Sequence, residues 1–382
     1  MENINNEPEV KTWDDLGLPD GILRSVYNYG FESPSEIQKK AIPPMLAKSD
    51  VIAQAQSGTG KTGAFVLGAL SQIDLSQATT QVVILAPTHE LVSQIHTVIQ
   101  NLSAFLTGLV ARIVVGGTSI SDDIRSFKTE VPHIVVGCTG RMFDMMKRGA
   151  IGTRHIKLCI LDEADEMLSF GFKEQMYNIF QLLPLNVQVA LFSATMPEPI
   201  MKITEKFMRD PVRIMMAPEE LNLEGIQQYY VAMYNDSAKC DRLKQLFQSL
   251  TASQTIIYAN NVTRVIDLYQ AMQEDGFSVC CLHSNMSKQE RKDVIGQFRS
   301  GTYRVLISSN ITARGIDVQQ VNTVINFDIP KSPETYLHRI GRSGRWGRKG
   351  VAINFVTKHD VVFMKDIEKY YRINIEELPE NF

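Results

Sequence analysis

Short apolar runs alternate with amphipathic stretches along the whole chain, and this alternation predicts strands joined by helices. Glycine, proline, serine or aspartate residues bound the apolar runs, which is typical of strands. In the first half the expected strands are Asp50–Ala55, Gln81–Ala86, Arg112–Val115, His133–Val136, Lys157–Leu161 and Gln188–Ser193. Helical patterns lie between most of them and favour a parallel sheet with helices on both faces.

A second set of the same kind follows the polar stretch Ala217–Gly225, which we expect to be a linker. Its expected strands are Gln254–Tyr258, Ser278–Leu282, Arg304–Ser308, Thr323–Asn326 and Gly350–Phe355. Helical patterns cover Arg264–Gln273 and Lys288–Phe298. The sequence therefore predicts two α/β units in tandem.

The segment after the first expected strand has the composition of a phosphate-binding loop. Its residues are Ala55, Gln56, Ser57, Gly58, Thr59, Gly60, Lys61 and Thr62, and an apolar helical pattern follows. Glycines let consecutive backbone N–H groups face phosphate oxygens, and a helix N-terminus adds a favourable partial charge. Lys61 can reach the β- and γ-phosphates, and the Thr62 hydroxyl can bind Mg²⁺. A plain glycine-rich turn would not need the Lys-Thr pair.

Acidic residues end the apolar run Leu158–Leu161. A carboxylate at a strand end beside a phosphate loop is the Mg²⁺ partner in nucleotide hydrolases, which makes Asp162 the candidate ligand, directly or through water. Glu163 is the candidate for orienting and deprotonating the attacking water. Alone, these acids could equally form a solvated loop; the phosphate loop upstream favours hydrolysis.

Two arginines, Arg342 and Arg345, stand three residues apart in the second half. On a helix they would share a face, and two guanidiniums on one edge suit a γ-phosphate, as arginine fingers do. Without the other motifs, a basic surface helix or a phosphate-backbone contact would be the better interpretation.

Charge and cysteine content change this picture little. The net charge is −3; residues 1–220 carry 19 basic against 25 acidic residues, and residues 221–382 carry 20 against 17. Neither half is the basic protein that non-specific nucleic-acid binders usually are. Five cysteines without a C-x-x-C pair indicate reduced thiols. Neither a membrane span nor a signal peptide is expected.

Taken together, the motifs resemble the DEAD-box family of ATP-dependent RNA helicases, most closely the translation initiation factor 4A group, from Trp13 to about Pro379. The resemblance implies two tandem RecA-like domains, each a mostly parallel sheet with helices on both faces. It places an N-terminal extension with the start of the adenine-reading motif at 1–19, the ATP-binding domain at 20–216, a linker at 217–225 and the C-terminal domain at 226–382. It implies ATP and Mg²⁺ as cofactors, and ATP hydrolysis coupled to RNA binding and local duplex unwinding.

The resemblance also assigns roles to single residues. The segment from Gly30 to Gln38 looks like the adenine-reading motif, in which Phe31 stacks on the base and Gln38 bonds its edge, with Trp13 at the upstream aromatic position. Asp317 matches the ribose contact. The residues implied to couple the domains are Asp165, Ser193, Thr195 and His338.

RNA is the implied partner, held by its backbone without base recognition. The residues implied to bind it are Pro87, Thr88, Glu90, Gly116, Gly117, Gly140, Arg141, Asn260 and Ser308. Hydroxyls, N–H groups and a few cations can hold phosphates, and contacts to the 2′-OH can distinguish RNA from DNA.

The chain departs from the usual family pattern in the segments that line the expected RNA path. The departing residues are His89, Cys138, Thr139, Val262, Asn285 and Asn310. Two cations and two carboxylates are lost, whereas the residues assigned to ATP are intact. We hypothesise a functional ATPase with a weakened or altered RNA grip; neutral drift in a chain that still unwinds RNA is the other interpretation.

Two other functions stay open at this level. One is an ATP-gated RNA clamp of the exon-junction type, and the other is an ATPase paralogue that acts through a protein partner. The resemblance to the 4A group implies a role in translation initiation, a scaffold partner of the MIF4G type or another protein partner, and a cytoplasmic or nuclear location.

Overall fold

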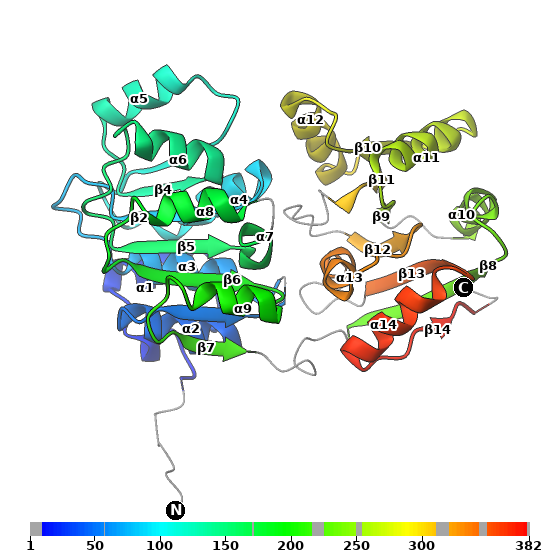
Figure 1. Ribbon diagram of the computed structural model, residues 1–382, viewed down its shortest axis with the longest axis horizontal. Helices are drawn as coiled ribbons and strands as arrows, with labels where there is room; N and C mark the ends of the chain where they lie inside the picture. The colour runs from blue at the N-terminus through cyan, green and yellow to red at the C-terminus, as the bar shows by residue number, and fades with distance from the viewer. Residues whose placement is uncertain are drawn as a thin grey trace, which may run out of the picture. The chain divides into compact units, whose positions relative to one another are not determined.

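Two compact units, Met1–Met216 and Ala217–Phe382, make up the chain (Figure 1). The computed structural model describes residues 10–56, 58–169, 172–215, 225–249, 254–310, 321–343 and 350–379. Each unit contains a seven-stranded sheet whose neighbouring strands are all parallel. The predicted α/β fold class is confirmed.

The first sheet has the strand order β3-β4-β2-β5-β6-β1-β7. Its strands are β1 (Val51–Gln54), β2 (Val82–Leu85), β3 (Ala111–Val114), β4 (Ile134–Gly137), β5 (Leu158–Asp162), β6 (Gln188–Ser193) and β7 (Val212–Met215). Its helices are the 3₁₀ helix Asp14–Leu16, α1 (Asp20–Asn28), α2 (Glu36–Leu46), α3 (Lys61–Leu70), α4 (His89–Leu102), α5 (Ile120–Thr129), α6 (Thr139–Lys147), α7 (Ala164–Met167), α8 (Lys173–Phe180) and α9 (Glu198–Thr204).

The second sheet has the order β10-β11-β9-β12-β13-β8-β14, which repeats the order of the first when each is numbered from its own first strand. Its strands are β8 (Ile226–Met233), β9 (Gln254–Tyr258), β10 (Val279–Leu282), β11 (Val305–Ser308), β12 (Val321–Asn326), β13 (Gly350–Thr357) and β14 (Glu376–Glu377). Its helices are α10 (Ala238–Ser249), α11 (Val262–Glu274), α12 (Lys288–Arg299), α13 (Pro333–Ile340) and α14 (Val361–Tyr371).

The apolar pattern predicted the other strands of both sheets and missed the edge strands β7 and β14 and the inner strand β8. Only Ile214 of β7 is buried, and both residues of β14 are exposed, so neither forms an apolar run. Strand β8 mixes buried and exposed positions along its length. The expected linker begins where the first unit ends, and its residues 217–224 lie outside the described part of the chain.

Both faces of the first sheet are covered by helices, and this explains the unbroken apolar runs. Successive residues of one strand contribute to two separate apolar clusters: Val51 and Ala53 of β1 belong to one, and Ile52 belongs to the other. The strand ends are therefore held rigidly, and the loops that follow them can present functional side chains. Among the described helices, none has the length and apolar character needed to span a membrane.

Candidate nucleotide site and nucleic-acid surfaces

The phosphate loop joins β1 to α3, as the sequence predicted. Gly60 precedes the helix with φ +100°, a region that favours glycine. A Cβ atom there would lie 2.8 Å from Nε2 of Gln38, so a larger residue would also displace the Gln38 side chain. Lys61 is buried and its Nζ donates to the carbonyl oxygen of Ala55 at 2.5 Å. Ser57 lies outside the described residues.

The expected adenine-binding residues lie against this loop. Gln38 of α2 accepts a hydrogen bond from the backbone N–H of Ser35 at 2.8 Å and donates from Nε2 to the carbonyl oxygen of Gly60 at 3.2 Å. The Phe31 ring stacks on the buried ring of Trp13, with centroids 5.8 Å apart and planes inclined by 15°. The residue expected to recognise the base is therefore hydrogen-bonded to the loop expected to hold the phosphates.

The two acids proposed for hydrolysis stand at the same edge of the sheet as the phosphate loop. Asp162 ends β5, and the order β5-β6-β1 leaves a single strand between it and the loop. Glu163 follows in the left-handed region with φ +51°, and both side chains are buried. The Oε2 atom of Glu163 has no hydrogen-bond partner in the described part of the chain.

The electrostatics of these acids suit a divalent cation. Burial, followed by the neighbouring Glu163 carboxylate, raises the pKa of Asp162 above its usual value, and Lys61 opposes the shift. Oxygen ligands are what Mg²⁺ prefers, and the Thr62 hydroxyl stands at the start of α3. A buried carboxylate that Lys61 compensates only in part, and a Glu163 oxygen without a hydrogen-bond partner in the described part of the chain, fit such an ion.

Asp165 connects the acidic segment to the next strand. Its two carboxylate oxygens accept hydrogen bonds from the hydroxyls of Ser193 at 2.8 Å and Thr195 at 2.6 Å, and all three side chains are buried. Ser193 ends β6, which lies between the acid-bearing strand and the strand of the phosphate loop. Three of the residues that the resemblance assigned to coupling, Asp165, Ser193 and Thr195, therefore contact one another within the first unit, and the fourth, His338, lies on α13 of the second unit.

The structure places Arg342 just past a helix and not on one. Helix α13 ends at Ile340, and Arg342 lies in the following turn, where its Nε donates to the carbonyl oxygen of His338 at 3.1 Å. The helical face that the spacing of the arginine pair suggested is therefore absent at Arg342. Arg345 and Asp317 lie outside the described residues.

Arg141, which we expected to contact RNA, bonds to other residues of the first unit. Its guanidinium forms an ion pair with Asp123 of α5 and donates to the Thr118 hydroxyl at 2.9 Å and carbonyl at 2.8 Å. Thr118 follows Gly116 and Gly117, and Gly117 has φ +81°. In this structure Arg141 thus holds the glycine loop in place.

Other expected RNA-contact residues of the first unit begin helices. Thr88 precedes α4, and its side chain accepts from the N–H of Leu91 at 3.3 Å. The departure Thr139 begins α6 and donates to the side-chain oxygen of Gln175 at 2.6 Å. Helix N-termini offer backbone N–H groups to phosphates, but here the Thr139 side chain is buried and Thr88 is only partly exposed.

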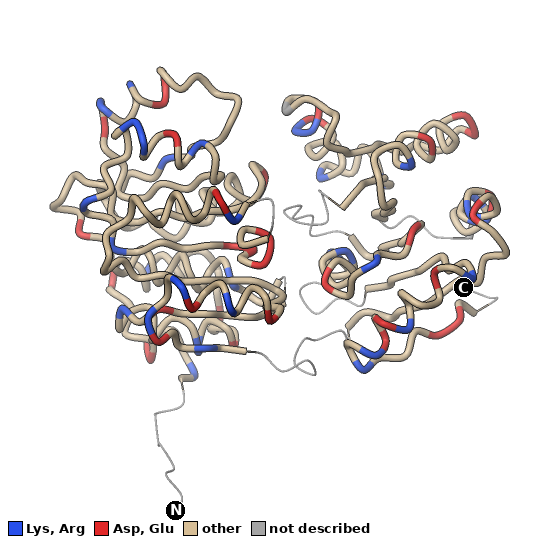
Figure 2. Tube along the Cα trace, viewed as in Figure 1, with Lys and Arg blue, Asp and Glu red and all other residues tan. Residues whose placement is uncertain are grey.

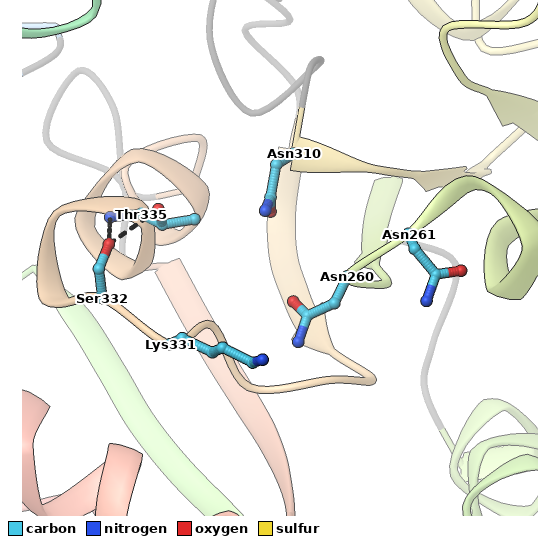
Figure 3. A pocket seen from close by; sticks show the side chains of 6 residues that line it. All are labelled: Asn260, Asn261, Asn310, Lys331, Ser332 and Thr335. Atoms are coloured by element: carbon cyan, nitrogen blue, oxygen red, sulfur yellow. Dashed lines mark hydrogen bonds between the residues drawn. The ribbon is translucent and has the colours of Figure 1, made fainter. Parts of the chain in front are cut away.

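In the second unit the expected contacts Asn260 and Ser308 differ in accessibility. Ser308 is fully buried, and its hydroxyl donates to the carbonyl oxygens of Leu282 and Ser309, so the structure does not present it to a ligand. Asn260 lines a pocket together with the departure Asn310 (Figure 3). Both amides bond to Arg339, a buried residue that the sequence analysis did not single out.

Charge is distributed evenly over the described residues. Basic and acidic residues are interspersed along the trace of each unit (Figure 2), in line with a net charge of −3. Binding to a nucleic acid would therefore depend on local groups and backbone N–H groups, as the sequence suggested.

Comparison with known proteins identifies the family of this chain. The DEAD/DEAH box helicase model matches residues 35–203, and the helicase conserved C-terminal domain model matches residues 238–347. The chain is 50% identical over 375 residues to "ATP-dependent RNA helicase eIF4A" of Debaryomyces hansenii, covering 98% of this chain and 94% of that protein. It is 52% identical over 375 residues to "Eukaryotic initiation factor 4A" of Cryptosporidium parvum, covering 98% and 92%.

Among solved structures, S. cerevisiae Dbp5 bound to RNA and ADP BeF3 is 35% identical, with a TM-score of 0.91, covering 97% of this chain and 96% of that chain. The tandem RecA-like fold is thereby confirmed. The chain belongs to the DEAD-box family of helicases, and within that family it is similar to the eIF4A proteins.

Proposed function

We propose that this protein is an ATP-dependent RNA helicase that acts in translation initiation, in the cytoplasm and together with a scaffold protein of the MIF4G type. The observation that carries the proposal is the shared edge of β1, β5 and β6. It brings together the phosphate loop, the acids Asp162 and Glu163, and the bonded group around Asp165. The eIF4A-named relatives support the role in initiation.

The residues of the first unit divide the work on ATP. Phe31 and Gln38 receive the adenine, and the N–H groups around Gly60 receive the phosphates. Lys61 leaves the Ala55 carbonyl and turns to the β- and γ-phosphates. Glu163 takes the proton of the attacking water.

A magnesium ion would be held by Thr62 and Asp162, where it would neutralise charge on the transferring phosphoryl group. Burial disfavours the ionised form of Asp162, and a bound cation would compensate the negative charge of this carboxylate. We propose that Arg342 and Arg345 of the second unit complete the site when ATP and RNA are both bound. Two ligands that each favour one arrangement of the units then bind cooperatively.

Strand separation tests the proposal directly. A short RNA duplex with a single-stranded extension should be separated by the protein with ATP, and not with a non-hydrolysable analogue under multiple turnover. The matched variant Glu163→Gln keeps the side-chain shape and removes the base, so it should bind ATP but fail to recycle. Separation by Glu163→Gln at the wild-type rate would contradict the assignment of the base.

A further inference from the structure

Arg339 of α13 is fully buried, and its guanidinium is surrounded by neutral oxygen atoms. It donates to the side-chain oxygens of Asn260 at 2.7 Å, Asn310 at 2.9 Å and Asn326 at 3.0 Å, and to the backbone carbonyl of Asp328 at 2.7 Å. Within the described residues no carboxylate bonds to this guanidinium. Its hydrogen bonds are satisfied, but in the described part of the chain its charge has no direct counter-ion.

The neighbouring carboxylate is already shared by other cations. Asp328 accepts two hydrogen bonds of 2.7 Å from Arg264 and pairs with Lys239 at 3.3 Å. Burial lowers the pKa of Arg339 to about 10, although the field of Asp328 opposes the shift. Arg339 is still charged at neutral pH, so the second unit buries a positive charge with incomplete compensation.

Two of the amides that bond to Arg339, Asn260 and Asn310, line a pocket of about 390 Å³ (Figure 3). The described residues that line it are Asn260, Asn261, Asn310, Lys331, Ser332 and Thr335, and no carboxylate is among these. The Lys331 side chain points toward Asn260, and Ser332 caps the first turn of α13. The amide donors, the ammonium group and the positive end of a helix all favour an anion.

Two of the lining residues connect the pocket to the buried charge. Asn260 and Asn310 both line the pocket and both accept hydrogen bonds from Arg339. The guanidinium of Arg339 is therefore separated from the pocket by the side chains of Asn260 and Asn310. Because Oδ1 of Asn310 is used by Arg339, its N–H groups are left for a ligand.

We infer that a backbone phosphate of the bound RNA strand lies in this pocket and acts as the counter-ion of Arg339. Arg339 depends on the RNA for this counter-ion because position 310 is a neutral asparagine. The inference rests on the proposed RNA-binding function. The buried guanidinium acts on the ligand through its electric field and not by contact, and it is a positioning residue in that sense. The substitution Asn310→Asp would compensate the charge of Arg339 inside the protein, so the pocket would attract the RNA phosphate less strongly.

The test compares the full-length wild type with Asn310→Asp and Lys331→Ala. The thermal unfolding midpoint is measured without ligand, and the affinity for a single-stranded uridylate oligonucleotide is measured across a salt series. Asn310→Asp should raise the midpoint and weaken binding roughly tenfold. The slope of log affinity against log salt should fall in magnitude by about 0.7, the value of one phosphate on a single strand.

The control separates charge compensation from simple loss of a cation. Lys331→Ala should weaken binding without raising the unfolding midpoint. An Asn310→Asp variant whose midpoint does not rise, or whose affinity and salt slope equal those of the wild type, would overturn the inference. If inorganic phosphate stabilised the wild type as much as the oligonucleotide does at matched ionic strength, the assignment of the pocket to the RNA strand would be overturned. A wild type that does not bind the oligonucleotide would instead refute the proposed function.

Discussion

Gln38 donates a hydrogen bond to the carbonyl oxygen of Gly60 at 3.2 Å, so the residue expected to read adenine is tied to the loop expected to hold the phosphates. The same side chain accepts from the backbone N–H of Ser35 and thereby caps α2. The start of α2 and the loop at Gly60 thus both depend on one side-chain amide, which is also the one expected to recognise the base. A change at this position should affect ATP binding in two ways, through the base and through the loop.

The substitution Gln38→Ala removes both hydrogen bonds. We expect the KM for ATP to rise about tenfold, because one or two hydrogen bonds contribute about 0.5–1.5 kcal/mol each. Steady-state ATPase assays with ATP and GTP measure the effect, and preference for ATP should fall. Lys39→Ala, on the same helix but paired with Glu36, is the control and should leave the KM unchanged. An unchanged KM in Gln38→Ala would refute the role of this amide.

The substitution Asp165→Asn leaves one side-chain oxygen to serve the two hydroxyls of Ser193 and Thr195. One buried hydroxyl then loses its acceptor, which should cost about 1–3 kcal/mol of stability. We expect a lower denaturant midpoint together with a loss of RNA-stimulated hydrolysis. Glu174→Gln, on the exposed face of α8, serves as the control. Full stimulation in Asp165→Asn would show that this group does not couple RNA to hydrolysis.

The substitution Asp123→Asn distinguishes two roles of Arg141. If Arg141 holds the loop at Gly116 and Gly117, Asp123→Asn loosens that loop and lowers RNA affinity. If Arg141 instead binds phosphate directly, removing its carboxylate partner frees the cation and raises affinity. The structure predicts the first result, because the Arg141 side chain is nearly buried at 7% exposure. Fluorescence anisotropy with labelled single-stranded RNA measures whether the RNA affinity falls or rises in Asp123→Asn.

The departures His89 and Val262 test whether lost cations weaken the RNA grip. Restoring arginine at both positions should raise RNA affinity and steepen its salt dependence by up to about 1.4, since each new phosphate contact adds roughly 0.7 to the slope on a single strand. The control Val262→Leu adds bulk without charge. If the double variant binds like the wild type at every salt concentration, the departures are neutral.

The sequence was sufficient for the parts of the fold that are buried on both sides. Strands such as β5 are continuous apolar runs because both sheet faces are covered, and such runs are visible without a structure. Edge strand β7 escaped notice because three of its four residues are exposed. Edge strands of this kind are specified by backbone pairing with a neighbour, here β1, more than by an apolar pattern.

The candidate site was predictable where chemistry requires a fixed residue order, as in the phosphate loop. Contacts across the fold were not predictable in the same way. Nothing in the local sequence indicates that Arg141 pairs with Asp123, 18 residues away. Likewise, the amides around Arg339 come from three separate strand ends and meet only when the sheet forms.

The most direct test of the account is ATP hydrolysis with and without single-stranded RNA, at low and moderate salt, beside the Glu163→Gln variant. The account predicts hydrolysis that RNA stimulates, that single-stranded DNA stimulates less, and that Glu163→Gln lowers by at least about 10². Hydrolysis that is abolished in Glu163→Gln but indifferent to RNA would contradict the helicase proposal and leave an ATPase that needs another partner.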